Sequence, residues 1–173
     1  MDPSASGPDV HYYMIRGGSS KTNITVWETG TIGGEYVKTY GHYHVDDIRE
    51  TYAILAGQGI LLIQQREKDQ NGKYIDDRIA SFLALRVKAG DSIPIPPYSG
   101  HLLVNTGRTW LVTSDDSPFN ADDSSGMPQH AEYETVRKMR GFAYYVVEKD
   151  GSPVLVKNNN YSSVPDAEIS DSQ

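Results

Sequence analysis

The chain has 173 residues, a length typical of one domain, and its 23 acidic and 16 basic residues give a formal net charge of −7. This acidic balance argues against nucleic acid as a partner, because phosphate backbones are bound by basic surfaces. The absence of Cys excludes disulfides, thiolate metal sites and a cysteine nucleophile. No run approaches the ~20 apolar residues of a membrane span, and residues 1–10 lack the features of a signal peptide. We therefore expect a cytoplasmic protein without a membrane partner.

Short segments rich in aromatic and β-branched residues, separated by Gly, predict a chain made mostly of strands. With 16 Gly and 9 Pro, the composition favours a turn-rich all-β protein over a helical bundle. The segment Gly57-Gln58-Gly59 predicts a tight turn with positive φ. Asn71-Gly72 predicts a hairpin from a strand that ends near Arg66 to one that begins near Tyr74. The other strands are expected at residues 12–15, 22–27, 35–40, 51–55, 59–65, 92–95, 102–105, 109–113, 142–148 and 153–157.

One helix is expected at residues 131–139, where good helix formers follow Pro128 and precede Gly141. The chain shows no internal repeat and no linker, so we expect one domain at residues 10–161. Loose tails are expected at residues 1–9 and 162–173, the second of them rich in Ser and Asp. Many short strands joined by Gly/Pro turns predict a sandwich or a barrel.

Two of the five histidines, His42 and His44, lie in the segment Gly-His-Tyr-His. On a strand, residues i and i+2 point to the same face, so both imidazoles project in one direction. Glu50 opens the next expected strand, and His101 begins another after a Pro-Pro-Tyr turn. Three imidazoles and one carboxylate form a mixed N/O set that suits Fe(II), Mn(II), Ni(II), Zn(II) or Co(II).

Each of these residues also has a plain structural interpretation. A His-x-His pair on a strand is often surface histidine, Thr25 and Thr39 are good β-formers, and Tyr52 can fill a barrel interior. The combination of the pair with Glu50 and the Pro-Pro-Tyr turn favours a metal site that keeps positions open for substrate.

At two motifs the chain resembles the cupin superfamily. The first, Gly-x5-His-x-His-x3,4-Glu-x6-Gly, falls on the two histidines, Glu50 and Gly57, with Tyr36 for the leading Gly and five residues before Glu50. The second, Gly-x5-Pro-x-Gly-x2-His-x3-Asn, runs from Gly90 to Asn105, with Tyr98 where a Gly is usual.

This resemblance implies an all-β fold, a single cupin jelly-roll β-barrel with one short helix in its C-terminal half. It also implies one divalent metal ion per chain. Fe(II) is the expected ion, with Mn(II), Ni(II), Zn(II) and Co(II) open. The implied ligands are His42, His44, Glu50 and His101.

Within the cupins, residues 30–44 followed by Glu-Thr-Tyr at 50–52 look like the cupin-type glucose-6-phosphate isomerases. The segment Pro-Pro-Tyr-x-x-His-x3-Asn-x-Gly at 96–107 and a closing Gly-Phe pair extend the likeness over about residues 12–160. The resemblance implies catalytic roles for Glu50, as ligand and base, and for Tyr52, beside the metal. A family Tyr that approaches the substrate is matched by Tyr12 or Tyr13. Residues implied in binding the substrate are Thr25, Thr39, Gly41, His130 and Tyr133.

The implied reaction interconverts glucose 6-phosphate and fructose 6-phosphate, and mannose 6-phosphate is a further candidate substrate. The proton transfer can pass through an enediol or be replaced by a metal-assisted hydride shift. Two alternatives remain open: another cupin metalloenzyme such as an Fe(II) dioxygenase, and a non-catalytic sugar-binding cupin. By analogy with cupins we expect a homodimer.

Overall fold

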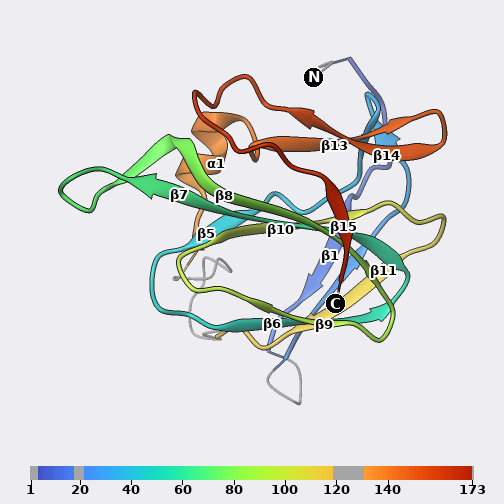
Figure 1. The fold of residues 1–173 in the computed structure, drawn as a ribbon. Coiled ribbons are helices and arrows are strands. Elements are labelled where there is room, and N and C mark those ends of the chain that lie inside the picture. Colours follow the sequence, from blue (N-terminus) through green and yellow to red (C-terminus); the bar gives the residue numbers. More distant parts are fainter. Residues whose placement is uncertain (1–3, 18–21, 119–130, 173) are drawn as a thin grey trace.

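The computed structural model describes residues 4–17, 22–118 and 131–172, which form three mainly antiparallel sheets and one short helix (Figure 1). In spatial order the five-stranded sheet contains β1 (Tyr12–Ile15), β2 (Asn23–Trp27), β11 (Leu111–Asp115), β6 (Glu50–Ala56) and β9 (Ser92–Ile95). The six-stranded sheet contains β12 (Ala131–Glu132), β5 (His42–His44), β10 (Gly100–Asn105), β7 (Gln58–Lys68), β8 (Tyr74–Lys88) and β15 (Ile169–Asp171), the last of which is parallel to β8. The four-stranded sheet contains β14 (Ser152–Lys157), β13 (Tyr144–Lys149), β4 (Glu35–Tyr36) and β3 (Thr31–Ile32).

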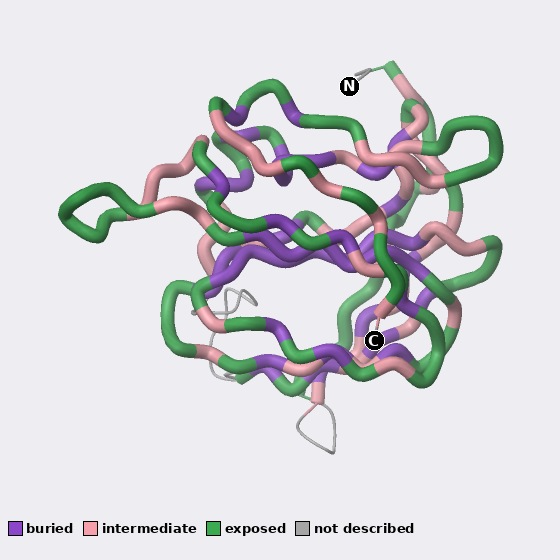
Figure 2. Tube along the Cα trace, in the orientation of Figure 1, coloured by how far each residue is buried: buried purple, intermediate pink, exposed green. Residues whose placement is uncertain are grey.

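The six-stranded sheet is the middle layer of the molecule, and the buried residues concentrate along it (Figure 2). Successive residues of β7 separate to its two faces: Ile60 and Leu62 join one apolar cluster, and Leu61 and Ile63 join the other. The first cluster lies against β13 and the helix, and the second against the five-stranded sheet. All six residues of β10 are therefore buried, because both of its faces are covered.

The all-β expectation is confirmed, and the two larger sheets pack face to face as in a jelly roll. The strands described do not close into a hydrogen-bonded barrel, so the barrel is better described as open sheets in layers. The Asn71-Gly72 hairpin is also confirmed: it joins β7 to β8, and Gly72 has φ +79°.

Two local expectations are wrong, in both cases because part of the expected element pairs with a strand that is distant in the sequence. The strand expected at residues 35–40 ends at Tyr36, since Glu35 pairs with β13 whereas Val37 and Thr39 bond to the backbone of β10. The helix expected at residues 131–139 is shorter, because residues 131–132 pair with β5 as β12. The helix α1 is Glu134–Met139, and Arg140 ends it in the left-handed conformation.

The loose tail expected at residues 162–173 is wrong for residues 162–172. Ile169–Asp171 forms β15 along β8, and Val164, Ala167 and Ile169 pack against the first apolar cluster. These apolar residues are spaced among Ser and Asp, so their joint contribution is not visible in the composition of the segment. No helix in the part of the chain that the structure describes is long and apolar enough to cross a membrane.

Gly57 and Gly72 allow a matched test of the turn chemistry. Both have φ near +80°, but a Cβ on Gly57 would lie 2.4 Å from the Trp110 carbonyl oxygen, whereas Gly72 faces open space. Gly57→Ala is therefore expected to lower the free energy of unfolding by about 1–3 kcal/mol more than Gly72→Ala. Urea denaturation of the two variants measures this difference, and equal losses would contradict the close approach at Gly57.

Candidate active site

Strands β5 and β10 bring the histidines together. His101 lies directly opposite His42 in the antiparallel register of these strands, and His44 follows on the same face of β5. The intervening Tyr43 turns to the opposite face and joins the first apolar cluster. Glu50 reaches the same space from β6 of the facing sheet.

The turn before His101 has a special backbone. Tyr98 adopts φ +58°, the left-handed region that favours Gly, which accounts for the Gly that is usual at this motif position. The Ser99 hydroxyl donates to the Pro96 carbonyl at 2.5 Å, and the Ser99 carbonyl accepts from the His44 amide at 3.1 Å. One turn thus ties the backbone of β5 to the start of β10.

Four potential ligand atoms converge in this buried space. One atom each from His42, His44, Glu50 and His101 lies within 4.8 Å of all the others. Glu50 Oε2 is 3.0 Å from His44 Nε2 and 3.2 Å from His101 Nε2, and these two nitrogens are 3.2 Å apart. Donor atoms held at about 2.1 Å by one ion lie about 3.0–3.4 Å apart at octahedral to tetrahedral angles. The four residues therefore fit a single divalent metal ion.

Burial favours the form of His44 that binds metal. His44 and His101 are each 1% exposed, and burial lowers the pKa of His44. The neutral imidazole, which carries the lone pair that a metal requires, is the favoured form of His44.

A second carboxylate, Asp115, stands beside Glu50. Burial raises the pKa of Glu50 well above its usual value, and the negative charge of Asp115 adds to this rise. Asp115 Oδ1 accepts hydrogen bonds from Asn23 Nδ2 at 2.7 Å and from the Ser117 hydroxyl at 2.6 Å. Two carboxylates in one buried space increase the local demand for a cation.

A cavity of about 50 Å³ opens onto this cluster. Nine residues singled out in the sequence line it: Tyr12, Thr25, Thr39, Gly41, His42, Glu50, Tyr52, His101 and Tyr133. His44 completes the cluster of ligand atoms without lining the cavity. His130 lies outside the described residues.

Two of the aromatic side chains frame the imidazoles. The Tyr52 ring lies 5.3 Å from that of His101 in an edge-on arrangement, and the Tyr133 ring lies 5.3 Å from that of His42. Burial raises the pKa of both phenols, so each stays protonated as a hydrogen-bond donor near neutral pH. Of the two candidates near the N-terminus, Tyr12 lines the cavity, whereas Tyr13 is 60% exposed.

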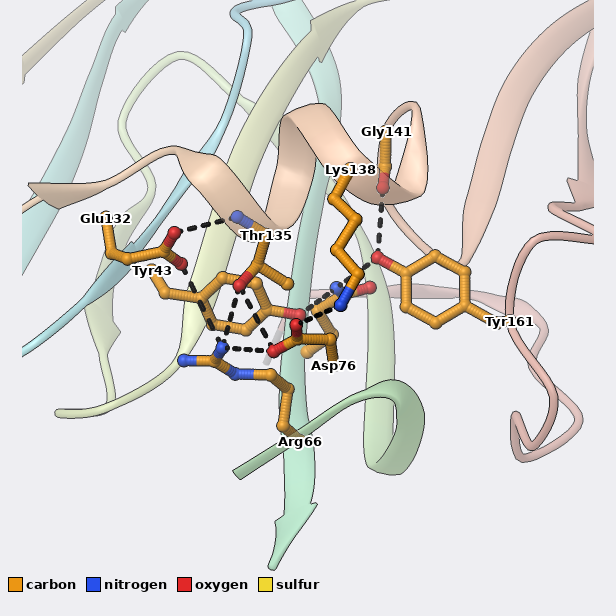
Figure 3. A network of polar contacts seen from close by, with 9 residues as sticks. Tyr43, Arg66, Asp76, Glu132, Thr135, Lys138, Gly141 and Tyr161 are labelled. Atoms are coloured by element: carbon orange, nitrogen blue, oxygen red, sulfur yellow. Dashed lines mark hydrogen bonds and ion pairs between the residues drawn. The ribbon is translucent and has the colours of Figure 1, made fainter. Parts of the chain in front are cut away.

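The residues on either side of Tyr133 in the sequence belong to a polar network on the other face of β5, which includes Glu132 and Thr135 (Figure 3). The Arg66 guanidinium stacks on the Tyr43 ring at 4.1 Å, pairs with Asp76 at 3.2 Å and donates to the Thr135 hydroxyl at 2.9 Å. Glu132 accepts from the Thr135 amide at 2.7 Å. The segment on both sides of Tyr133 is thereby fixed to the strand that carries His42 and His44.

Two charged residues of the cavity, Arg16 and Asp115, are not among the residues expected from the sequence. Each lies at or just beyond the end of an expected strand, at residues 12–15 and 109–113. Extending the alternation by one step, from Met14 to Arg16 and from Thr113 to Asp115, is the signal that would have found them.

Comparison with known proteins gives a consistent result. The family model described as "Glucose-6-phosphate isomerase (GPI)" matches residues 9–164. The glucose-6-phosphate isomerase of Thermococcus litoralis is 32% identical over 136 residues, which are 78% of this chain and 60% of that protein. The corresponding protein of Pyrococcus abyssi is 29% identical over 80% of this chain and 63% of its own length. The chain thus spans less than two thirds of these relatives.

Similar solved structures include the cupin domain of Drosophila melanogaster CENP-C, with a TM-score of 0.43 and 9% identity over 66% of this chain and 74% of that chain. A second is a protein from Thermotoga maritima described as a predicted oxalate decarboxylase, with a TM-score of 0.36 and 22% identity over 55% of this chain and 62% of that chain.

The ligand cluster generates a binding prediction. Metal at about 100 times its dissociation constant is expected to raise the free energy of unfolding by about 2.7 kcal/mol. His101→Ala should weaken the affinity at least about 100-fold, because loss of a residue that merely supports a ligand already costs about 10–100-fold. Calorimetric titration and thermal unfolding with and without a chelator measure both effects.

The matched control is His11→Ala, which removes an exposed histidine outside the cluster. It is expected to bind one metal ion per chain with unchanged affinity. Equal loss of affinity in both variants would contradict this ligand set.

Proposed function

The chain belongs to the cupin-type glucose-6-phosphate isomerase family, and from this premise we propose that it interconverts glucose 6-phosphate and fructose 6-phosphate. The observation that carries the proposal is the cavity, in which a fitting metal-ligand cluster lies beside hydroxyl-bearing and amide groups. These relatives are named for this reaction, and this chain spans 60–63% of the length of the two compared above.

Aldose–ketose isomerisation moves hydrogen between two neighbouring carbons of an open-chain sugar. When bound by His42, His44, Glu50 and His101, a divalent ion supplies Lewis acidity that polarises a sugar oxygen. Glu50 is the proposed base. Its Oε2 faces the histidine nitrogens, which leaves Oε1 as the atom that takes a proton from one carbon and returns it to the next.

Other residues of the cavity bind and orient the substrate in this proposal. The protonated phenol of Tyr52 donates a hydrogen bond toward the reacting end of the sugar, and that of Tyr133 donates from the side of His42. Thr25 and Thr39 supply hydroxyl groups for the phosphate. Gly41 supplies a backbone that a Cβ would prevent, because this atom would lie 2.9 Å from the Phe142 ring and 3.1 Å from Leu102. His130 is retained as a substrate-binding candidate.

We propose Fe(II) as the ion, with Mn(II), Ni(II), Zn(II) and Co(II) as alternatives. Imidazole nitrogen is a suitable ligand for most of these metals, and a carboxylate oxygen is suitable for the harder ones. The donor set is therefore compatible with all five ions and does not select one of them. Mannose 6-phosphate, which differs from glucose 6-phosphate only at C2, is a further proposed substrate. A phosphorylated sugar as substrate supports a cytoplasmic location, because charged metabolites do not cross membranes unaided.

A homodimer is proposed through the outer face of the five-stranded sheet. Tyr13 and Ile15 are each 60% exposed on β1, and the register places Val26 and Ile24 of β2 beside them. Val112 of β11 extends this apolar surface. An apolar sheet face of this kind is suited to a second copy of the same face.

A coupled assay for conversion of fructose 6-phosphate into glucose 6-phosphate tests the function. Chelator-stripped protein is expected to be inactive, and addition of Fe(II), Mn(II), Ni(II), Zn(II) or Co(II) in turn should restore turnover. Glu50→Gln should lower kcat by about 10²–10⁴-fold, the usual contribution of a positioned base, whereas exposed Glu134→Gln should not. Metal content is measured in parallel, because Glu50 is also a proposed ligand.

Absence of turnover with every ion, despite one bound metal per chain, would reject the isomerase. Consumption of O2 by the Fe(II) form would then indicate a dioxygenase. Binding of sugar phosphate without any reaction would indicate a sugar-binding cupin.

The dimer has its own test. Ile15→Lys places a charge on the apolar face and is expected to convert the dimer into a monomer, as measured by light scattering after size exclusion. Val156→Lys makes the same change on the four-stranded sheet at a residue of 44% exposure and should leave the dimer intact. A monomeric wild-type protein would contradict the proposal directly.

A further inference from the structure

Among the residues that line the cavity of the candidate site, three carry full charges: Arg16, Glu50 and Asp115. Arg16 is the one cation among these described residues. The protein as a whole is acidic, with a formal charge of −7, so a doubly negative substrate group gains no long-range attraction from the surface. A doubly negative substrate group must therefore be attracted by a positive charge within the cavity, in addition to that of the metal.

The strand register brings the backbone of Arg16 near that of Thr25, and both residues line the cavity. On β1, Tyr12 and Met14 line the cavity while Tyr13 and Ile15 are exposed, so the alternation turns Arg16 inward as well. Met14 lies directly opposite Thr25 in the β1–β2 pairing. Arg16, two residues farther on, is the diagonal neighbour of Thr25, a separation of about 7–8 Å between backbones that a long side chain spans.

Hydrogen bonds fix the backbone next to Arg16. The Gly17 amide donates to Asn23 Oδ1 at 3.1 Å, and Asn23, which is 1% exposed, donates in turn to Asp115 at 2.7 Å. The guanidinium contacts Met14 Sδ at 3.5 Å, and it lies close enough to the Tyr133 phenol to oppose the rise in the pKa of that group. Within the described residues no carboxylate forms an ion pair with it, although Glu50 is near enough for Arg16 to oppose the rise in the pKa of that residue.

We propose that Arg16 binds the phosphate group of the sugar phosphate and makes this cavity selective for phosphorylated over unphosphorylated sugars. This inference rests on the proposed function for the identity of the sugar. The guanidinium is a planar fork that matches two phosphate oxygens, and its charge is permanent. The hydroxyl groups of Thr25 and Thr39 and the backbone amide of Gly41 can donate hydrogen bonds to oxygens of any charge, so they do not by themselves select the dianion.

The position of Arg16 also couples phosphate binding to Tyr133. Arg16 and Tyr133 line the same cavity, Arg16 at the end of β1 and Tyr133 between β12 and α1, and the positive charge of Arg16 acts on the Tyr133 phenol. A phosphate that binds the guanidinium neutralises the positive charge that acts on this phenol. Arg16 is thus assigned to binding and specificity, at a distance from the atoms that react.

The test compares binding and turnover in Arg16→Gln, Arg16→Lys and the wild type. Arg108→Gln is the matched control, because Arg108 is an exposed arginine in the turn after β10, at the end of this strand remote from His101. Each metal-loaded protein is titrated calorimetrically with glucose 6-phosphate, with glucose and with inorganic phosphate. Thermal unfolding and metal content verify that each variant is folded and loaded.

Arg16→Gln is expected to lower the affinity for glucose 6-phosphate and for inorganic phosphate about 10- to 100-fold, the loss associated with charge-assisted hydrogen bonds. The affinity for glucose should be unchanged. Arg16→Lys should lose less, because it keeps the charge without the fork. In the isomerase assay, KM should rise by the same factor while kcat changes less than about threefold. Arg108→Gln should match the wild type in every measurement.

Wild-type affinity for glucose 6-phosphate in Arg16→Gln would overturn the proposal, and so would a fall in kcat at unchanged KM, which would place Arg16 at the reacting atoms. The outcome for the proposed function is separate. A wild-type protein that binds glucose 6-phosphate through Arg16 but does not isomerise it refutes the isomerase and retains this phosphate site. A protein that isomerises with no dependence on Arg16 does the reverse.

Discussion

The pairing of β5 with β10 is the constraint on which the candidate site depends. It places His101 opposite His42, and it does so in the middle layer of the molecule, where both faces of the sheet are covered. Alternation then separates two tasks within three residues of β5. His42 and His44 face the five-stranded sheet, and Tyr43 faces the other way into the first apolar cluster. A shift of register by one residue would exchange these faces and dismantle the ligand cluster.

A buried polar network holds this register in place. Gln64 Nε2 donates to the Tyr43 hydroxyl and, at 3.2 Å, to that of Tyr161, while its Oε1 accepts from the Ala143 amide at 2.9 Å. Tyr161 in turn donates to the Gly141 carbonyl at 2.9 Å. Fully satisfied groups of this kind favour one arrangement over its neighbours, because any slip leaves a buried donor or acceptor without a partner. These hydrogen bonds therefore connect β5, β7 and the residues that follow the helix beneath the cavity.

The sequence predicts the ligand cluster well because the information is local. Two histidines lie two residues apart on one strand, and a carboxylate and a His after a Pro-rich turn follow them. This pattern can be recognised without knowledge of the order of strands in the sheet. Arg16 and Asp115 could not be found in this way, since their meeting depends on the pairing of β1 with β2 and of β2 with β11. The same reason explains β12 and β15: residues 131–132 and 169–171 have weak strand propensity, and their partners decide their conformation.

The strand β15 has a consequence for how molecules of this protein meet in solution. β8 has 15 residues, and an uncovered edge of that length would offer a row of free amides and carbonyls to another chain. Residues 162–172 occupy much of this row: Ser162 donates to Asp77, the Ser163 carbonyl accepts from Ile79, and Ser172 donates to Arg86. The polar C-terminal segment therefore covers the edge of β8 and disfavours edge-to-edge aggregation. Its Ser and Asp residues disfavour the pairing of a further strand with β15.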